Sequence, residues 1–396
     1  MAISKISANM IDGSLTSSLV TGTLPAVSGV ALLNAGGGID TETTSDPLTT
    51  SNPSATGHLW LNKNSGEMYV CTDATAGANI WINIGTPFHG VGKCFGGQGG
   101  GTVSGFHAGG DLNLVIHKYS FTSDGNAVSH GNISSNGGGT YMPGSASSAT
   151  HGYNISGVQA PSNAQTTKIE KYAFASAGGS SAPAGLVVSQ AGQDQSGHSS
   201  STHGYRSGGI APAPVGTVNI LDKFSFSSDD AAVDHGDLTR ASYDHAGMSS
   251  VTHGYCAGGT PSSNNLIIDR FSFASAGTAT DHGDLLATFI SRRGGHSSNE
   301  SGFISGGGGP ITNTVETFSF ASNSVATDHC NLSVARVAHG TTSSVTHGYA
   351  SGGAPNSNGV REVIDKFAFV SPSATASDVG NLTNFSNTFG GGSHQT

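Results

Sequence analysis

From about residue 105 onward, hydrophobic and polar positions alternate in short segments that recur along the chain. In each copy, two aromatic residues stand at alternate positions with Ser or Ala between them. A period of two places both rings on one face of a β-strand, whereas a helical repeat needs a period of about 3.6. The pattern predicts strands at Tyr119/Phe121, Tyr172/Phe174, Phe224/Phe226, Phe271/Phe273, Phe318/Phe320 and Phe367/Phe369.

Glycines mark the period of the repeat. A Gly-aromatic dipeptide begins at Gly105, Gly152, Gly204, Gly254, Gly302 and Gly348, so the copies are 46 to 52 residues apart. A glycine pair follows a few residues later, at Gly109-Gly110, Gly208-Gly209, Gly258-Gly259, Gly306-Gly307 and Gly352-Gly353, with Ser156-Gly157 in the second copy. A period of this size combined with strand patterning indicates propeller blades rather than helical repeats.

Two further segments complete most copies, giving four short strands each. One contains Asp-His-Gly or a related sequence, and the other carries Arg and His before the next Gly-aromatic dipeptide. Six copies counted from Gly105 end close to the end of the chain. Similar segments at 92–101 and 386–394 predict that strands from both termini meet in one blade, so that the circle has no free edge.

Composition supports an all-β fold and narrows the function. The chain has 396 residues, of which 60 are glycine and only 10% are charged, which suits many tight turns. The formal charge of −10 argues against nucleic-acid binding. No segment approaches about 18 consecutive apolar residues, so we expect no membrane insertion. We expect the protein to be made in a cytoplasm. The scattered cysteines Cys71, Cys94, Cys256 and Cys330 predict buried free thiols.

The Asp-His pairs Asp234-His235, Asp281-His282 and Asp328-His329 resemble part of a catalytic triad. They recur once per copy, so a propeller would spread them around its axis instead of gathering them. We therefore predict a turn-stabilising role on the outer strand and no enzymatic activity. The histidines of the Thr-His-Gly-Tyr segments are expected to pack rather than to bind metal, so no catalytic residue, metal site or cofactor is predicted. These histidines are His151, His203, His253 and His347.

The loop after the glycine pair is the part that varies between copies. It is rich in Asn, Ser, Pro and Gln, side chains that suit adaptable hydrogen bonding to sugar hydroxyls. Ordinary solvated loop residues are the alternative interpretation at each position. The candidate receptor-binding residues are Gln159, Asn163, Asn264, Asn265, Asn313, Asn356 and Arg361.

The first 85 residues have a different pattern. Residues 1–57 are polar with short apolar spots, and they predict an extended anchoring arm and linker that become ordered on another chain. Residues 58–85 predict a small three-stranded β-module with strands at 58–62, 67–73 and 79–84. Candidate anchoring residues are Ile3, Ile6, Met10, Ile11, Trp60 and Trp81.

Two resemblances follow from these motifs. The glycine pair and the alternating aromatic strand resemble the kelch repeat over roughly residues 93–396, although the chain has Asp-His-Gly-Asp-Leu where kelch repeats usually have Trp. This resemblance implies a six-bladed kelch-like β-propeller over 86–396. The segments GHLWLNKNSGEMYV, MAISKISANMIDGSLT and TGTLPAVSG resemble parts of marine, cyanophage-like bacteriophage tail-fibre and virion structural proteins.

The phage resemblance implies a virion protein, made in the host cytoplasm, that uses its propeller for adhesion. Its expected partners are other virion proteins, through the arm, and a host surface polysaccharide or outer-membrane component. A homo-oligomer is expected on the particle, with a trimer as the candidate state. A purely architectural role as a capsid decoration or tail adaptor is the alternative, and a glycan-cleaving enzyme, which would require paired carboxylates in one cleft, is a third.

Overall fold

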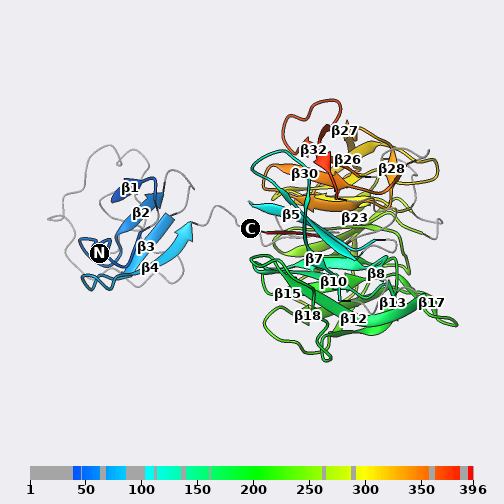
Figure 1. Ribbon diagram of the computed structural model, residues 1–396, viewed down its shortest axis with the longest axis horizontal. Coiled ribbons are helices and arrows are strands. Elements are labelled where there is room, and N and C mark those ends of the chain that lie inside the picture. Colours follow the sequence, from blue (N-terminus) through cyan, green and yellow to red (C-terminus); the bar gives the residue numbers. More distant parts are fainter. Residues whose placement is uncertain are drawn as a thin grey trace, which may run out of the picture. The chain divides into compact units, whose positions relative to one another are not determined.

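A computed structural model describes residues 39–45, 47–62, 68–85, 103–110, 114–134, 140–159, 162–260, 265–286, 291–355, 362–383 and 391–395. All regular elements within these ranges are β-strands, as expected for the all-β class. The chain divides into two compact units, Met1–Pro87 and Phe88–Thr396. Each unit contains β-strands of its own (Figure 1).

The first unit contains a four-stranded sheet: the three predicted strands are present, but the predicted total of three was wrong. The additional strand, β1, lies inside the segment assigned to the linker and pairs in parallel with β2. The Asp40 carboxylate holds this pairing by accepting a hydrogen bond from the backbone N–H of Leu59 (2.7 Å). The sequence carries no turn signal for this pairing. Hairpin turns join antiparallel neighbours, whereas two parallel strands are joined by a longer connection. The strands are β1 (Thr41–Thr43), β2 (Leu59–Asn62), β3 (Met68–Asp73) and β4 (Ile80–Gly85).

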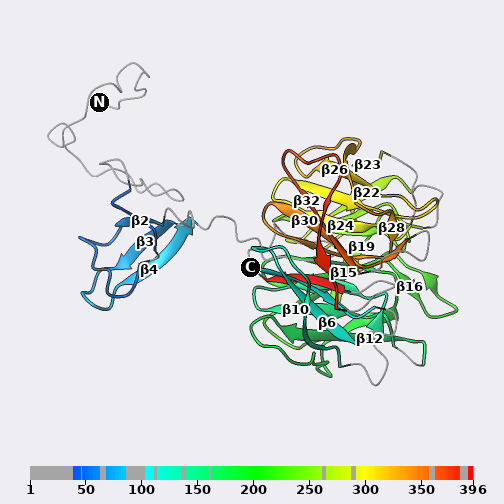
Figure 2. The same cartoon turned by 45° about the horizontal axis from the view of Figure 1, so that its top comes forward.

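The second unit contains, within its described residues, six antiparallel sheets built on the same four-strand plan (Figures 1 and 2). Sheets 1 to 3 are β34 (Gly391–Gln395), β5 (Ser104–Ala108), β6 (Val115–Ser120), β7 (Val128–Asn132); then β9 (Gly144–Ser147), β10 (His151–Ile155), β12 (Ala164–Ala173), β13 (Val187–Gly192); then β14 (Ser196–Ser199), β15 (His203–Ser207), β18 (Ile220–Ser225), β19 (Val233–Asp237).

Sheets 4 to 6 are β20 (Ala246–Ser249), β21 (His253–Ala257), β22 (Ile267–Ser272), β23 (Thr280–Asp284); then β24 (Gly294–Ser297), β25 (Ser301–Ser305), β26 (Thr314–Ser319), β27 (Thr327–Asn331); then β29 (Gly340–Ser343), β30 (His347–Ser351), β32 (Val363–Ala368), β33 (Ser377–Asn381). Short pairs extend sheet 2 and accompany sheets 3 and 6. They are β8 (Thr140–Tyr141), β11 (Val158–Gln159), β16 (Ile210–Ala211), β17 (Gly216–Thr217), β28 (Arg336–Val337) and β31 (Ala354–Pro355).

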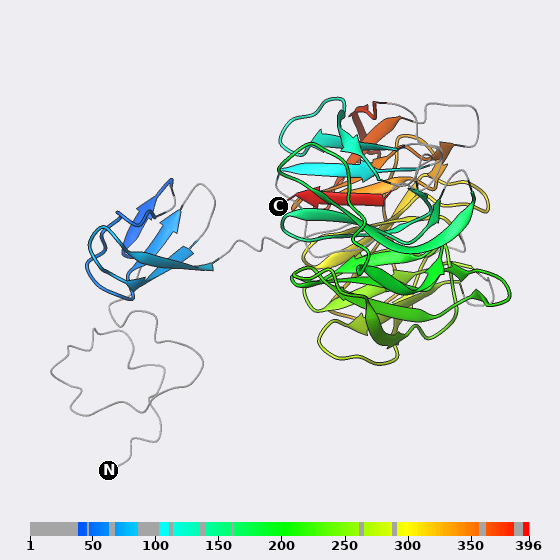
Figure 3. The same cartoon turned by 60° about the horizontal axis from the view of Figure 1, so that its bottom comes forward.

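Strands from opposite ends of the unit meet in sheet 1, as predicted for the C-terminal segment. Strand β34 pairs antiparallel with β5, with Ser393 opposite Phe106. Figure 3 shows this red C-terminal strand among the cyan and teal strands of the first sheets. The segment at 92–101, the other half of that prediction, lies outside the described residues.

The first strand of each sheet contacts the first strands of two other sheets. Strand β14 contacts β9 and β20, β24 contacts β20 and β29, and β34 contacts β29 and β9. Glycine permits this close approach: a Cβ on Gly197 would lie 2.0 Å from the carbonyl oxygen of Ser145, and one on Gly295 would lie 2.1 Å from that of Gly247. A larger residue at either position would force neighbouring sheets apart.

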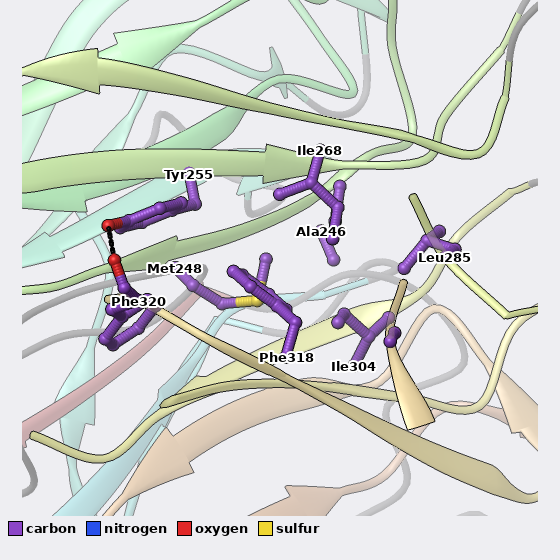
Figure 4. Packing of buried hydrophobic residues seen from close by; sticks show 10 residues of the cluster. Ala246, Met248, Tyr255, Ile268, Leu285, Ile304, Phe318 and Phe320 are labelled. Atoms are coloured by element: carbon purple, nitrogen blue, oxygen red, sulfur yellow. Dashed lines mark hydrogen bonds between the residues drawn. The ribbon is translucent and has the colours of Figure 1, made fainter. Parts of the chain in front are cut away.

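Aromatic stacking joins consecutive sheets. The aromatic residue of each Gly-aromatic dipeptide stacks on the second aromatic residue of the next sheet, as Tyr255 does on Phe320 with centroids 4.6 Å apart (Figure 4). The preceding glycine makes room for the first aromatic ring, because a Cβ on Gly254 would lie 2.2 Å from Phe271. The other stacks are Phe106/Phe174, Tyr153/Phe226, Tyr205/Phe273, Phe303/Phe369 and Tyr349/Phe121.

Candidate functional site

The variable loops and the connections into the first strands lie at the same end of the sheets. This follows from antiparallel order, because the second strand ends where the first begins. Backbone pairs tie the two kinds of loop together in several sheets. Gln193 pairs with Ile210, Tyr243 with Thr260 and Ser291 with Gly308. We call this end the loop face.

A series of left-handed residues crosses the loop face. Each lies two positions before a first strand, and the N–H of every member after the first donates to the carbonyl oxygen of the residue before it in the series, at 2.9 to 3.1 Å. Positive φ is uncommon for residues other than glycine and persists where surrounding contacts determine the conformation. The left-handed series is Met142 (φ 58°), Asp194 (56°), Asp244 (58°), Arg292 (61°) and Ala338 (58°).

The polar members of the left-handed series form a group that does not recur in the other described connections. Asp194 and Asp244 are 9% and 8% exposed. The Gln193 side chain donates to Asp194 Oδ2 at 2.9 Å, and Arg292 Nε lies 3.6 Å from Asp244 Oδ2. The Oδ1 atoms of both carboxylates are buried and have no hydrogen-bond partner among the described residues.

Burial controls the acidity of this pair. It raises the pKa of Asp244 to about 7; the neighbouring Asp194 carboxylate also raises it, while Arg292 opposes the change. Burial raises the pKa of Asp194 as well, while the hydrogen bond from Gln193 lowers it. These two groups border one hollow with Met142, Arg292 and neighbouring residues, and it has room for about one water molecule. Such a hollow can hold a proton or a water but excludes a sugar ring.

Each sheet also buries a polar residue two positions before its first paired aromatic, which the sequence analysis did not recognise. The signal was present as an acid at the same place in five of the six copies. Five of these groups contact the chain that leaves the preceding sheet; for example, Asp365 accepts from Ser333 N (3.0 Å) and pairs with Arg336 at 2.8 Å. The sixth, Asp222, accepts from the N–H of Ser189 in the outer strand of the preceding sheet. We call these residues the inter-sheet staples. They are His117, Glu170, Asp222, Asp269, Glu316 and Asp365.

The inter-sheet staples are dispersed, one to a sheet, so they stabilise junctions rather than form a catalytic centre. The ion pairs Arg206–Asp222 and Arg293–Glu316 are similarly buried. In sheet 1 the position is His117, whose Nδ1 lies 2.9 Å from the Thr383 hydroxyl. Thr383 follows sheet 6 at the position that Ser333 occupies after sheet 5.

The described receptor-binding candidates occupy different environments on the loop face. Gln159 is half-buried in β11, and Asn163 is exposed in a left-handed turn. Asn265 is only 9% exposed. The Asn313 side chain donates to the carbonyl oxygen of Leu332 at 3.1 Å and so supports a connection. Asn264, Asn356 and Arg361 lie outside the described residues.

The Asp-His pairs have the predicted turn and outer-strand roles. His282 Nε2 lies 2.9 Å from the carbonyl oxygen of Ser319 in the next sheet, while Asp281 accepts from the N–H of Gly283 at 2.8 Å. His235 and His329 make the same type of contact. The histidines of the Thr-His-Gly-Tyr segments lie 2.7 to 2.8 Å from the hydroxyl of the preceding threonine. In the part of the chain described, no group of three or more His, Cys, Asp or Glu residues is placed to hold a metal ion.

The anchoring candidates of the first unit are described only in part. Trp60 and Trp81 pack edge to face with centroids 5.5 Å apart, and Trp60 donates to the carbonyl oxygen of Ser45 at 2.9 Å. These contacts give both rings a role within the sheet. Ile3, Ile6, Met10 and Ile11 lie outside the described residues. Cys71, Cys256 and Cys330 are buried free thiols, as predicted, and Cys94 lies outside the described residues.

No family model matches this chain, and no curated protein matches it. Among the described residues there is no helix that could span a membrane.

Proposed function

We propose that sheets 1 to 6 are the blades of a closed, six-bladed, kelch-like β-propeller. The cyclic contacts among β9, β14, β20, β24, β29 and β34 support this arrangement. The stack of Tyr349 on Phe121 and the contact of Thr383 with His117 support packing of sheet 6 on sheet 1. Full closure leaves no free sheet edge to aggregate.

We further propose that the protein is a bacteriophage virion structural protein that adheres to the host surface. One observation carries the proposal: stacks and staples repeat from sheet to sheet, whereas the loops that begin at the glycine pairs differ in length and sequence on one face. Variable polar loops on a rigid scaffold are the usual arrangement of recognition surfaces. The expected receptor is a polysaccharide or an outer-membrane component.

The first unit is proposed to join the propeller to other virion proteins. Its support is the resemblance to phage fibre sequences and the separate compact sheet around Trp60 and Trp81. Display of several copies, with a trimer as the candidate assembly, would convert weak sugar contacts into tight attachment. Removal of residues 1–38 should abolish incorporation into particles; normal incorporation of the truncated chain would overturn the anchoring role.

Adhesion is tested with purified full-length protein on cells of the host. A Gln159→Ala/Asn163→Ala variant should lower cell binding measured by flow cytometry, because both side chains lie on the loop face. A Ser123→Ala variant is the matched control, since Ser123 is exposed in a loop at the opposite end of its sheet. Binding by neither the wild type nor the control would favour the architectural alternative.

One observation favours the glycan-cleaving alternative: Asp194 and Asp244 are paired, unrepeated carboxylates with raised pKa. The small size of their hollow argues against a sugar substrate. Incubation with host envelope polysaccharide should release no reducing sugar. Release that Asp244→Asn abolishes would make the protein an enzyme.

A further inference from the structure

The carboxylates of Asp194 and Asp244 come from the connections into neighbouring sheets. We propose that they hold one proton between them and form a pH-sensitive latch between sheets 3 and 4. Backbone geometry brings the pair together, because the N–H of Asp244 donates to the carbonyl oxygen of Asp194 at 2.9 Å. Both residues are more than nine-tenths buried and border the same hollow.

A proton satisfies the unpartnered oxygens of the pair. Two carboxylates at a poorly solvated site repel each other, and one shared proton removes a charge and supplies a hydrogen bond. Asp194 Oδ1 and Asp244 Oδ1 are the buried oxygens without partners. With the proton present, the remaining negative charge is balanced by Arg292, whose Nε lies 3.6 Å from Asp244 Oδ2.

A second guanidinium, that of Arg293, borders the hollow, but its charge is compensated by an acid of its own sheet. From sheet 5, Arg293 is paired with Glu316 at 2.9 Å. From sheet 4, burial lowers the pKa of His245 to about 3, so its ring is neutral. From sheet 3, Gln193 and Gln195 provide amides, and sheet 2 contributes Met142 and Pro143. Arg292, with 46% of its side chain exposed, is the cation facing the pair among the described residues.

The closed state of the latch should be more stable at low pH than at high pH. In the opened state the Asp244 pKa returns toward its ordinary value of 3.8, whereas in the closed state it is about 7. The closed state therefore binds more protons, and its stabilisation is lost as the pH rises through 7. Linkage with these values gives closure that is about tenfold more favourable at pH 6 than at pH 8.

Opening of the latch would directly affect the variable loops of the loop face. Tyr243 precedes Asp244 and exchanges two backbone hydrogen bonds with Thr260, at 2.9 and 2.8 Å. Gln193 precedes Asp194 and exchanges two with Ile210, at 3.0 and 2.8 Å. Thr260 and Ile210 begin the variable loops of sheets 4 and 3, so both loops are tied to the latch.

Hydrogen exchange of the full chain at pH 6 and pH 8, corrected for intrinsic exchange rates, tests the latch. In the wild type, the amides of Asp244 and Thr260 should lose about tenfold in protection at pH 8. Asp244→Asn keeps the shape, tolerates positive φ and cannot ionise, so its protection should not change with pH. Asp281→Asn, at an exposed outer-strand aspartate, should behave as the wild type.

Equal protection at both pH values in the wild type would overturn the proposal, as would a loss that persists in Asp244→Asn. Infrared difference spectra supply a readout independent of folding: a carboxyl band titrating near pH 7 should be present in wild type and absent from Asp244→Asn. A rise in Tm on adding calcium at pH 8 that Asp244→Asn removes would make the ligand a metal ion and would also overturn the proposal.

Discussion

The rings of Phe121 and Tyr349 stack with their centroids 4.7 Å apart and their planes 28° apart, although the residues belong to the first and the last sheet. The same geometry recurs between Tyr205 and Phe273, where the sheets are consecutive in sequence. The last junction thus uses the side-chain arrangement of the others. Stability at every junction should depend on the same few contacts, which leads to the following predictions.

Removing an inter-sheet staple should be costly. Asp365→Ala leaves the Arg336 guanidinium and the Ser333 groups without their acceptor in a buried site. Loss of one member of a buried pair costs about 3–5 kcal/mol in the free energy of unfolding. Urea denaturation measures this, with Asp378→Ala as the control because Asp378 is exposed. A loss below about 1 kcal/mol would contradict the role of the staple.

The glycine before each aromatic residue should resist substitution. In Gly254→Ala, the new Cβ would lie 2.2 Å from the Phe271 ring. The Phe271 ring must then shift and disturb the adjacent stack of Tyr205 on Phe273. Overpacking of this type costs about 1–3 kcal/mol. Gly178→Ala is the matched control, since a Cβ there meets no atom within 4 Å. Similar Tm values for both variants would exclude this steric explanation.

Buried histidines should make the protein unfold in acid. Burial lowers the pKa of His296 to about 4 and that of His107 to about 3, whereas both return toward about 6.5 when the chain unfolds. The unfolded chain therefore binds more protons, and stability present above pH 6.5 is lost as the pH falls.

Substitution of one histidine measures its contribution to the loss of stability in acid. His296→Asn should reduce the slope of unfolding free energy against pH by up to about 1.4 kcal/mol per pH unit between pH 6 and 4. The replacement also loses the 2.8 Å contact with Ser305, so the slope, rather than the absolute stability, is the readout. An unchanged slope would show that His296 is protonated in the folded protein.

The first unit should unfold as a separate transition. Asn79 is 2% exposed, and its side chain donates to the Thr49 carbonyl and to Asn52 Oδ1, both at 2.8 Å. Asn79→Ala should lower the midpoint temperature of the calorimetric transition of the first unit and leave that of the second unit unchanged. A shift of both transitions would contradict independent folding of the two units.

Strand patterning predicted much of the second unit because its signals are local. Alternating aromatics and glycine pairs specified strands such as β22, and the exposure pattern of Asp281 and His282 followed from the same alternation. Strand β1 was missed because its pairing with β2 is parallel and carries no turn signal. The left-handed series was missed because Met142, Arg292 and Ala338 have no intrinsic preference for positive φ, and tertiary contacts determine it.

The candidate site was predictable only as a face. Repetition identified the variable loops, but the pairing of Asp194 with Asp244 depends on two connections 50 residues apart meeting across a sheet junction. The sequence shows Asn265 and Asn313 only as polar residues of variable loops. In the structure Asn265 is buried, and the Asn313 side chain donates to the carbonyl oxygen of Leu332. Composition alone does not distinguish a solvated amide from one that supports the backbone.

A double-mutant cycle on Phe121 and Tyr349 tests the closed circle most directly. The full chain, each alanine variant and the double variant are unfolded in urea, and the same cycle on Tyr255 and Phe320 provides the reference for adjacent sheets. Closure predicts a coupling of about 0.5–1.5 kcal/mol for Phe121 with Tyr349, similar to that of the reference pair. Coupling in the reference pair with none between Phe121 and Tyr349 would contradict it.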